Sequence, residues 1–139
     1  MGINSNIRIE VKTMDMPVMR SLPQNIEAEQ SVLGSMIIDR AAIATAAEAL
    51  SVDDFYRDSH KVIFSTIVEM TQRDIPVDMI TLIEHLRSVS KLEAAGGITY
   101  ITEISTSVPS TANLRSYINI VSQKSILRRL IKASNEIIE

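Results

Sequence analysis

The stretch TANLRSYINIVSQKSILRRLIKASNEIIE, residues 111–139, decides the fold. It contains neither glycine nor proline, so no residue in it breaks a helix. Its apolar residues recur at helical spacing in two stripes: Leu114, Tyr117, Ile118 and Val121, then Ile126, Leu127, Leu130, Ile131, Ile137 and Ile138. A helix of this length extends roughly 40 Å at about 1.5 Å per residue, which exceeds the width of a small globule. We therefore expect a long helix whose far end needs a partner.

The residues before this stretch show shorter helical patterns. PQNIEAEQSVLGSMIID (23–39), AAIATAAEAL (41–50), HKVIFSTIVEMTQRD (60–74) and MITLIEHLRSV (79–89) each place apolar residues on one face. Asn25 and Asp78 are the expected N-caps, and Gly34, inside the first helix, predicts the close approach of another helix. The sequence therefore predicts an all-α fold, a compact bundle of five or six short helices followed by one long carboxy-terminal helix.

This pattern divides the chain into three parts. We expect residues 1–21 to be a flexible leader or tag-like tail, residues 22–110 a helical globular subdomain, and residues 111–139 the long helix. The pattern still runs at the final NEIIE, with no capping glycine, so we expect a fragment whose helix continues in a longer protein.

LEAAGGITYI, residues 92–101, holds the only paired glycines and admits two interpretations, a phosphate-binding loop or a tight stop between two helices. A P-loop needs glycines followed by lysine and then serine or threonine, whereas Ile-Thr-Tyr follows here. The dinucleotide fingerprint G-x-G-x-x-G is also absent. We therefore predict that Gly96 takes the left-handed conformation that ends a helical turn, and that the next helix begins at once.

Other catalytic signals are equally sparse. The chain has no cysteine, and neither of its two histidines, His60 and His85, has a second ligand at zinc spacing. We expect His60 to start a helix and to bond through its ring to a nearby backbone group or carboxylate. There is no G-x-S-x-G elbow, no apolar run near the roughly 20 residues that span a bilayer, and no signal-peptide core. The predicted protein is non-catalytic, metal-free and cytoplasmic.

Charge is distributed unevenly along the chain. The net charge is −3, but residues 22–110 carry six basic and thirteen acidic side chains, whereas residues 111–139 carry five basic and two acidic. An acidic globule argues against a free-standing nucleic-acid binder. The alternative interpretation, a stand-alone nucleic-acid-binding module, would use the basic helix 115–132 and predicts salt-dependent DNA binding through Arg128 and Arg129.

Five stretches carry a family resemblance in order and spacing. These are PQNIEAEQSVLGSMIID, DDFYRDSHKVIFSTIVEM, IPVDMITLIEHL, LEAAGGITYITEI and SVPSTANLRSYINIVSQKSILRRLI. Together, over about residues 22–139, they resemble the amino-terminal domain of the bacterial replicative DNA helicase of the DnaB family. The leader departs from the family in length and composition, as a phage or plasmid relative or added residues would.

The resemblance implies a collar domain without the motor. In this family ATP and Mg²⁺ belong to a separate carboxy-terminal ATPase domain, and the collar domains form a trimer of dimers in the hexamer. Residues 111–139 would be the first arm of the pairing hairpin, with the second arm absent. The expected subunit-interface residues are Tyr117, Val121, Leu127, Leu130 and Ile131.

The same collar docks the carboxy-terminal domain of primase, and in some species a loader protein, so DNA is contacted only through the full hexamer. Glu27 and Tyr100 are the predicted primase contacts. The alternative for these two residues is structural, with Tyr100 half-buried in its own core and Glu27 serving the dipole of its helix.

Overall fold

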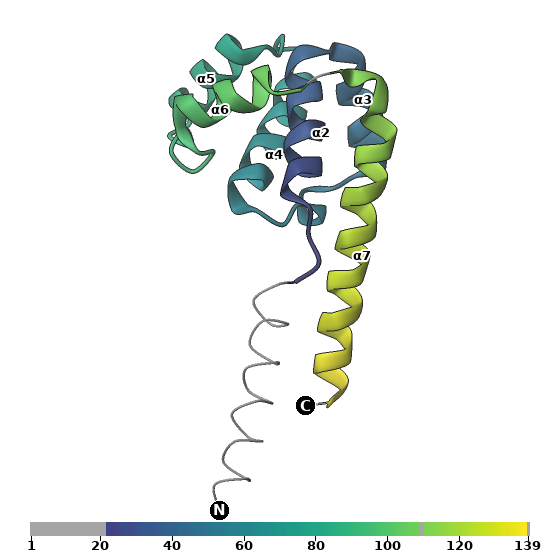
Figure 1. The fold of residues 1–139 in the computed structure, drawn as a ribbon. Coiled ribbons are helices and arrows are strands. Elements are labelled where there is room, and N and C mark those ends of the chain that lie inside the picture. The colour runs from purple at the N-terminus through teal and green to yellow at the C-terminus, as the bar shows by residue number, and fades with distance from the viewer. Residues whose placement is uncertain (1–21, 109, 139) are drawn as a thin grey trace, which may run out of the picture.

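The computed structural model describes residues 22–108 and 110–138, so the prediction for the leader, residues 1–21, lies outside the described residues. The helices are α2 (Ile26–Ile38), α3 (Arg40–Ala49), α4 (Asp58–Gln72), α5 (Met79–Ser88), α6 (Gly97–Thr106) and α7 (Leu114–Ile138). Two 3₁₀ turns, η1 (Val52–Asp54) and η2 (Thr111–Asn113), join them, and the described ranges contain no strand. The all-α prediction is confirmed, with shorter helices leading to one long carboxy-terminal helix (Figure 1).

Side-chain caps set several helix boundaries. Asn25 accepts a hydrogen bond from the Ala28 amide at 2.9 Å and so begins α2. Asp39 ends α2 and begins α3, because its carboxylate accepts the Ala41 amide at 3.0 Å. Asp78 forms a reciprocal capping box with Thr81 at the start of α5. The caps predicted at Asn25 and Asp78 are therefore confirmed.

Helix α2 lies at the centre of the bundle and packs against α3, α4, α6 and α7. Val32, Leu33 and Met36 on its core face are fully buried. A Cβ atom at Gly34 would collide with the Val108 side chain and the Ile104 carbonyl, both contributed by the end of α6 and the segment that follows it. The predicted close approach at Gly34 is thus confirmed, and glycine is required there by space.

Helix α7 has a packed half and a protruding half. Leu114 and Ile118 are buried where the helix lies against α2 and α3, and its last turns extend past the other described helices (Figure 1). The interface prediction for Val121 is wrong. Val121 is 1% exposed because its stripe faces the core of its own domain. Tyr117 is half-buried against the same core.

The second stripe of α7 faces outward. Leu127 is 44% exposed and Leu130 is 59% exposed, while Ile131 is half-buried. Ile126, on the same part of the helix, is 48% exposed. The long helix therefore buries one apolar stripe internally and leaves the other uncovered by the described residues.

Candidate functional site

The Gly-Gly step positions Tyr100. The Gly97 amide donates to the Leu92 carbonyl at 2.9 Å and the Gly96 amide donates to the Glu93 carbonyl at 3.0 Å, a Schellman-type ending. Gly96 has a φ of +104°, in the left-handed region that favours glycine, and α6 begins at Gly97. Both parts of the prediction are confirmed. A Cβ at Gly96 would lie only 2.5 Å from Cδ2 of Tyr100, so the bare glycine also makes room for that ring.

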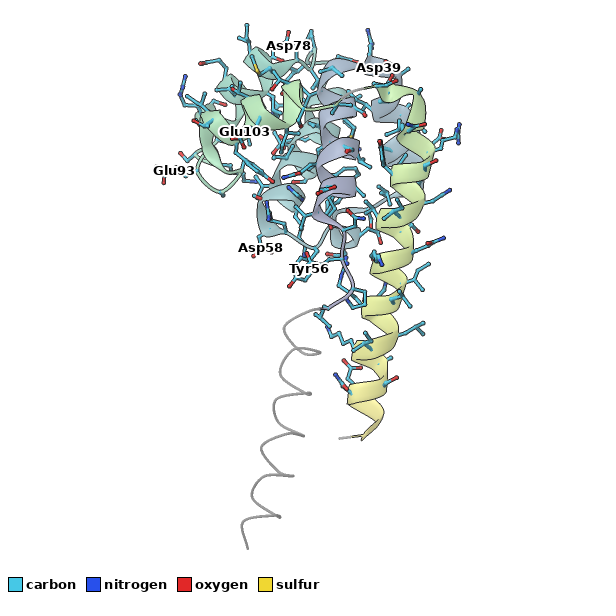
Figure 2. All side chains as sticks on the ribbon, in the orientation of Figure 1. Asp39, Tyr56, Asp58, Asp78, Glu93 and Glu103 are labelled. Carbon is cyan, nitrogen blue, oxygen red and sulfur yellow. The ribbon has the colours of Figure 1, made fainter. Side chains whose placement is uncertain are left out.

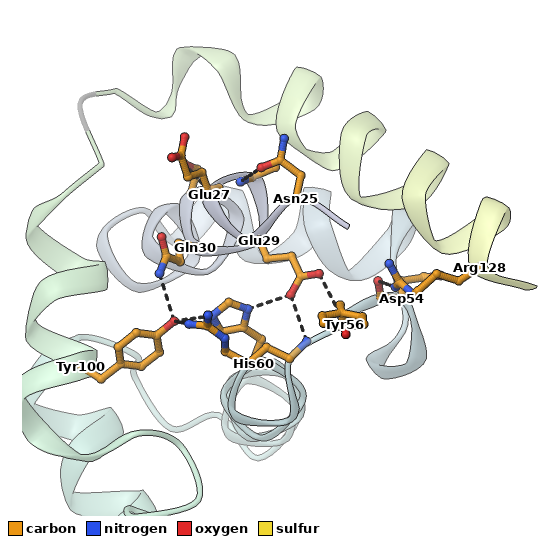
Figure 3. Close-up of polar contacts among 12 residues, drawn as sticks. Asn25, Glu27, Glu29, Gln30, Asp54, Tyr56, His60, Tyr100 and Arg128 are labelled. Atoms are coloured by element: carbon orange, nitrogen blue, oxygen red, sulfur yellow. Dashed lines mark hydrogen bonds and ion pairs between the residues drawn. The ribbon is translucent and has the colours of Figure 1, made fainter. Parts of the chain in front are cut away.

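Tyr100 ends a polar chain that runs into the core (Figure 3). Its hydroxyl lies 2.6 Å from Nε2 of His60, and Nδ1 of His60 donates to the Glu29 carboxylate at 2.7 Å. His60 is 0% exposed and Glu29 is 1% exposed, so both ionisable groups are enclosed by protein. The carboxylate also accepts the Tyr56 amide at 2.8 Å, at the entry to α4. This Glu29–His60–Tyr100 chain therefore joins α2, α4 and α6.

Hydrogen-bond capacity fixes the directions of these bonds. Because the Glu29 carboxylate accepts from Nδ1 of His60, a neutral ring has an unprotonated Nε2 that accepts the tyrosine hydroxyl proton. The two lone pairs of the hydroxyl then accept Nε2–H of Gln30 at 3.1 Å and Nη1–H of Arg57 at 2.8 Å. The donors and acceptors of the chain match with His60 neutral. A satisfied buried network of this kind holds its members in one arrangement.

The two predicted primase contacts, Glu27 and Tyr100, do not touch each other. Tyr100 is half-buried and packs on the core, whereas Glu27 is exposed and points away from the polar chain (Figure 3). The expectation that the ring of His60 bonds to a carboxylate is confirmed by Glu29. Glu29 itself was not predicted. Its burial could have been inferred from the sequence, because Glu29 lies three and four positions before the apolar residues Val32 and Leu33 and so shares their face of α2.

A second polar cluster fastens α7 to the globule. Asp54 accepts the Ser125 hydroxyl at 2.7 Å and Nη2–H of Arg129 at 2.8 Å. Arg128 donates to the backbone carbonyls of Pro23 at 2.7 Å and Asp54 at 2.8 Å, and its guanidinium lies 5.4 Å from the ring centroid of Tyr56. These contacts fix how α7 leaves the domain. They also use some of the donors of Arg128 and Arg129, the two arginines on which the DNA-binding alternative depends.

Residues 22–108 and 110–138 contain neither a membrane-spanning helix nor a cluster of metal ligands. No helix in these ranges is long and apolar enough to cross a membrane. These ranges also contain no group of three or more histidine or acidic side chains placed to hold a metal ion.

The fold and the two polar clusters define a small all-α domain from which an amphipathic helix protrudes, an architecture suited to binding other proteins. Residues 21–123 match the family model described as DnaB-like helicase N terminal domain. The chain belongs to this family, as the resemblance predicted.

Relatives and solved structures agree with this assignment. The replicative DNA helicase DnaC of Bacillus subtilis is 47% identical over 115 residues, which are 83% of this chain and 25% of that protein. The replicative DNA helicase DnaB of Geobacillus stearothermophilus is 44% identical over the same shares of the two chains. This chain therefore spans about a quarter of the length of these relatives.

Two solved structures share the fold. The crystal structure of the N-terminal domain of DnaB helicase from Mycobacterium tuberculosis superposes with a TM-score of 0.81 at 37% identity, covering 84% of each chain. A structure of a DnaB-like replicative helicase and its interactions with primase gives a TM-score of 0.72 at 30% identity, covering 82% of this chain and 27% of that one.

Proposed function

We propose that this domain is the non-catalytic collar of a hexameric replicative DNA helicase, where it pairs subunits and docks primase. The observation that carries the proposal is the outward apolar stripe of α7, formed by Ile126, Leu127 and Leu130 on a helix that protrudes from its domain. A second copy of the chain could bury such a stripe against its own α7. In this view α7 is the first arm of the pairing hairpin, and ATP and Mg²⁺ would act on a separate motor domain.

Primase docking rests on the likeness to the replicative helicase that was solved with its primase interactions. The junction of α2, α4 and α6 is the best candidate for that contact, because a buried polar chain holds it rigid and reaches the surface at Tyr100. Rigid surfaces lose little conformational freedom on binding. In species that use a helicase loader, the same collar would also bind the loader protein.

The DNA-binding alternative receives no support from the side chains of α7. Arg128 donates to the backbone carbonyls of Pro23 and Asp54 and Arg129 donates to the Asp54 carboxylate, at distances of 2.7–2.8 Å, so both guanidinium groups already bind within the domain. DNA would then be reached only through the complete hexamer.

Light scattering coupled to size-exclusion chromatography tests the pairing. The wild-type chain should increase in mass with concentration, and Leu130→Asp should remain a monomer because it places a charge on the apolar stripe. Ile38→Asp is the matched control, since Ile38 is similarly exposed, at 52% against 59%, but lies on α2. A wild-type chain that is monomeric up to hundreds of micromolar, or a control that dissociates as Leu130→Asp does, would contradict pairing through α7.

Calorimetric titration with the carboxy-terminal domain of the cognate primase tests the docking. We expect a saturable complex with a dissociation constant in the micromolar range or tighter. No detectable heat or co-elution from the folded chain at such concentrations would remove primase from the proposal.

A further inference from the structure

Arg57 differs in its surroundings from Arg73 and Arg87, two of the other three arginines between residues 22 and 110. Arg73, just after α4, pairs with Glu69 of that helix, and Arg87 pairs with Glu84 of its own helix, α5. Arg57, the residue before α4, forms no ion pair with any carboxylate in the part of the chain that the structure describes. Its side chain is exposed, and its one side-chain hydrogen bond there is from Nη1 to the Tyr100 hydroxyl. A guanidinium has five N–H donors, so most of those on Arg57 remain available to a partner.

Buried residues of the domain hold the Arg57 guanidinium in place through the Tyr100 hydroxyl. The Tyr100 hydroxyl is held by His60 and, through it, by Glu29, both enclosed in the core. The Tyr100 ring lies against Gly96 and stacks on the His60 ring. The two ring centroids are 5.9 Å apart, and the ring planes differ by 8°. The guanidinium carbon of Arg57 lies 5.9 Å from the centroid of the same tyrosine ring. Arg57 is therefore a surface cation that a buried network has placed in advance.

The neighbourhood of Arg57 offers space and several acidic side chains. Gln30, which shares the Tyr100 hydroxyl with Arg57, also lines a surface hollow of about 310 Å³ between α2 and the end of α6. Asp58, Glu93 and Glu103 project from the side of the globule away from α7 (Figure 2). An acidic side chain of a partner would be repelled by these carboxylates and attracted by Arg57, with Lys61 one helical turn further along α4. Such a pattern fixes the register of a docked segment.

Building on the proposed docking of primase, we infer that Arg57 receives an aspartate or glutamate side chain of the primase carboxy-terminal domain, and that Tyr100 is the residue that positions Arg57. Arginine suits this role because its planar guanidinium can donate two parallel hydrogen bonds to one carboxylate. In this arrangement the Tyr100 hydroxyl binds only groups of its own domain. The partner contacts the guanidinium of Arg57, which the hydroxyl positions.

A double-mutant cycle on the 139-residue chain tests this inference, with the carboxy-terminal domain of the cognate primase as the probe. Arg57→Gln should weaken binding about tenfold, in the range for loss of a charged hydrogen-bonded contact. Tyr100→Phe should weaken it less, and the double variant no more than Arg57→Gln alone, because both changes act on one contact. Arg57→Lys should recover only part of the affinity. Arg73→Gln, at the opposite end of α4, is the control and should bind like wild type.

Ionic strength gives an independent measurement. Raising the salt concentration should weaken wild-type binding more than it weakens Arg57→Gln binding, because the variant has already lost an ion pair. Circular dichroism of each variant verifies that the domain remains folded.

The outcomes separate the two proposals. Wild-type binding that Arg57→Gln leaves unchanged would refute the role of Arg57 while primase docking stands. Independent, additive losses from Arg57→Gln and Tyr100→Phe would refute the positioning role of Tyr100. Absence of wild-type binding would refute primase docking itself and the role of Arg57 with it.

Discussion

Glu29→Ala tests whether the buried polar chain holds the helices together. The Glu29 carboxylate accepts Nδ1–H of His60 at 2.7 Å and the Tyr56 amide at 2.8 Å, and a longer contact of 3.5 Å comes from the Arg57 amide. Glu29 is 1% exposed, so water has no direct access to the donors that truncation would release. The substitution thus leaves two well-aligned buried donors without an acceptor.

The expected magnitude follows from this count. An unsatisfied buried polar group costs about 1–3 kcal/mol, so two such groups cost about 2–6 kcal/mol. We therefore expect Glu29→Ala to lower the free energy of unfolding by about 2–6 kcal/mol, a large share of the ~5–15 kcal/mol typical of a domain.

Glu29→Gln should lie between Glu29→Ala and wild type. Its amide oxygen can still accept the Tyr56 amide, and its NH₂ group can donate to Nδ1 of His60 once the ring proton moves to Nε2. Urea denaturation followed by circular dichroism measures the differences, at one fixed protein concentration so that self-association does not alter the comparison.

Glu27 provides the matched control. It is also in the first turn of α2 but is exposed, so Glu27→Ala removes the same interaction with the helix dipole without unpairing a buried donor. We expect Glu27→Ala to change stability by less than about 1 kcal/mol. If Glu29→Ala and Glu27→Ala differ by less than that, the buried chain is not a structural element of this domain.

Two other substitutions test the Gly-Gly turn and the fastening of α7. Gly96→Ala should destabilise the domain more than Gly97→Ala. Both glycines have positive φ, at a cost to alanine of about 1–2 kcal/mol, but only at Gly96 would a Cβ also strike the Tyr100 ring. Equal melting temperatures would contradict this. Asp54→Ala should speed amide hydrogen exchange in the second half of α7 by at least about tenfold, since it releases Ser125 and Arg129, whereas the exposed neighbour Asp53→Ala should not. Unchanged exchange in Asp54→Ala would mean that the cluster does not fasten the helix.

Local signals in the sequence predicted much of the fold. The caps at Asn25 and Asp78 and the left-handed turn at Gly96 depend on residues only a few positions apart, so the sequence alone indicates them. Gly34 predicted a close helix contact, although the sequence did not identify the end of α6 as its neighbour. The long helix followed from the apolar spacing and the absence of breakers.

Long-range contacts limited the prediction of the site. Helical spacing shows that Val121 lies on an apolar stripe, but it does not show whether the same domain or another subunit covers that stripe. The partners of Glu29 and Asp54 lie up to 31 and 75 positions away in the chain, beyond the reach of any local pattern. Glu29 could have been suspected from its place among buried residues of α2, whereas Asp54 carried no comparable signal.

Amide hydrogen exchange of the chain, measured with and without the carboxy-terminal domain of primase, tests most directly whether this domain acts as a docking platform. We expect slower exchange at the start of α4 and across α2 and α6 around Tyr100 when primase is present, with the core of α5 unchanged. Exchange that is identical in both samples under saturating primase, or protection confined to segments remote from this junction, would contradict the docking surface described above.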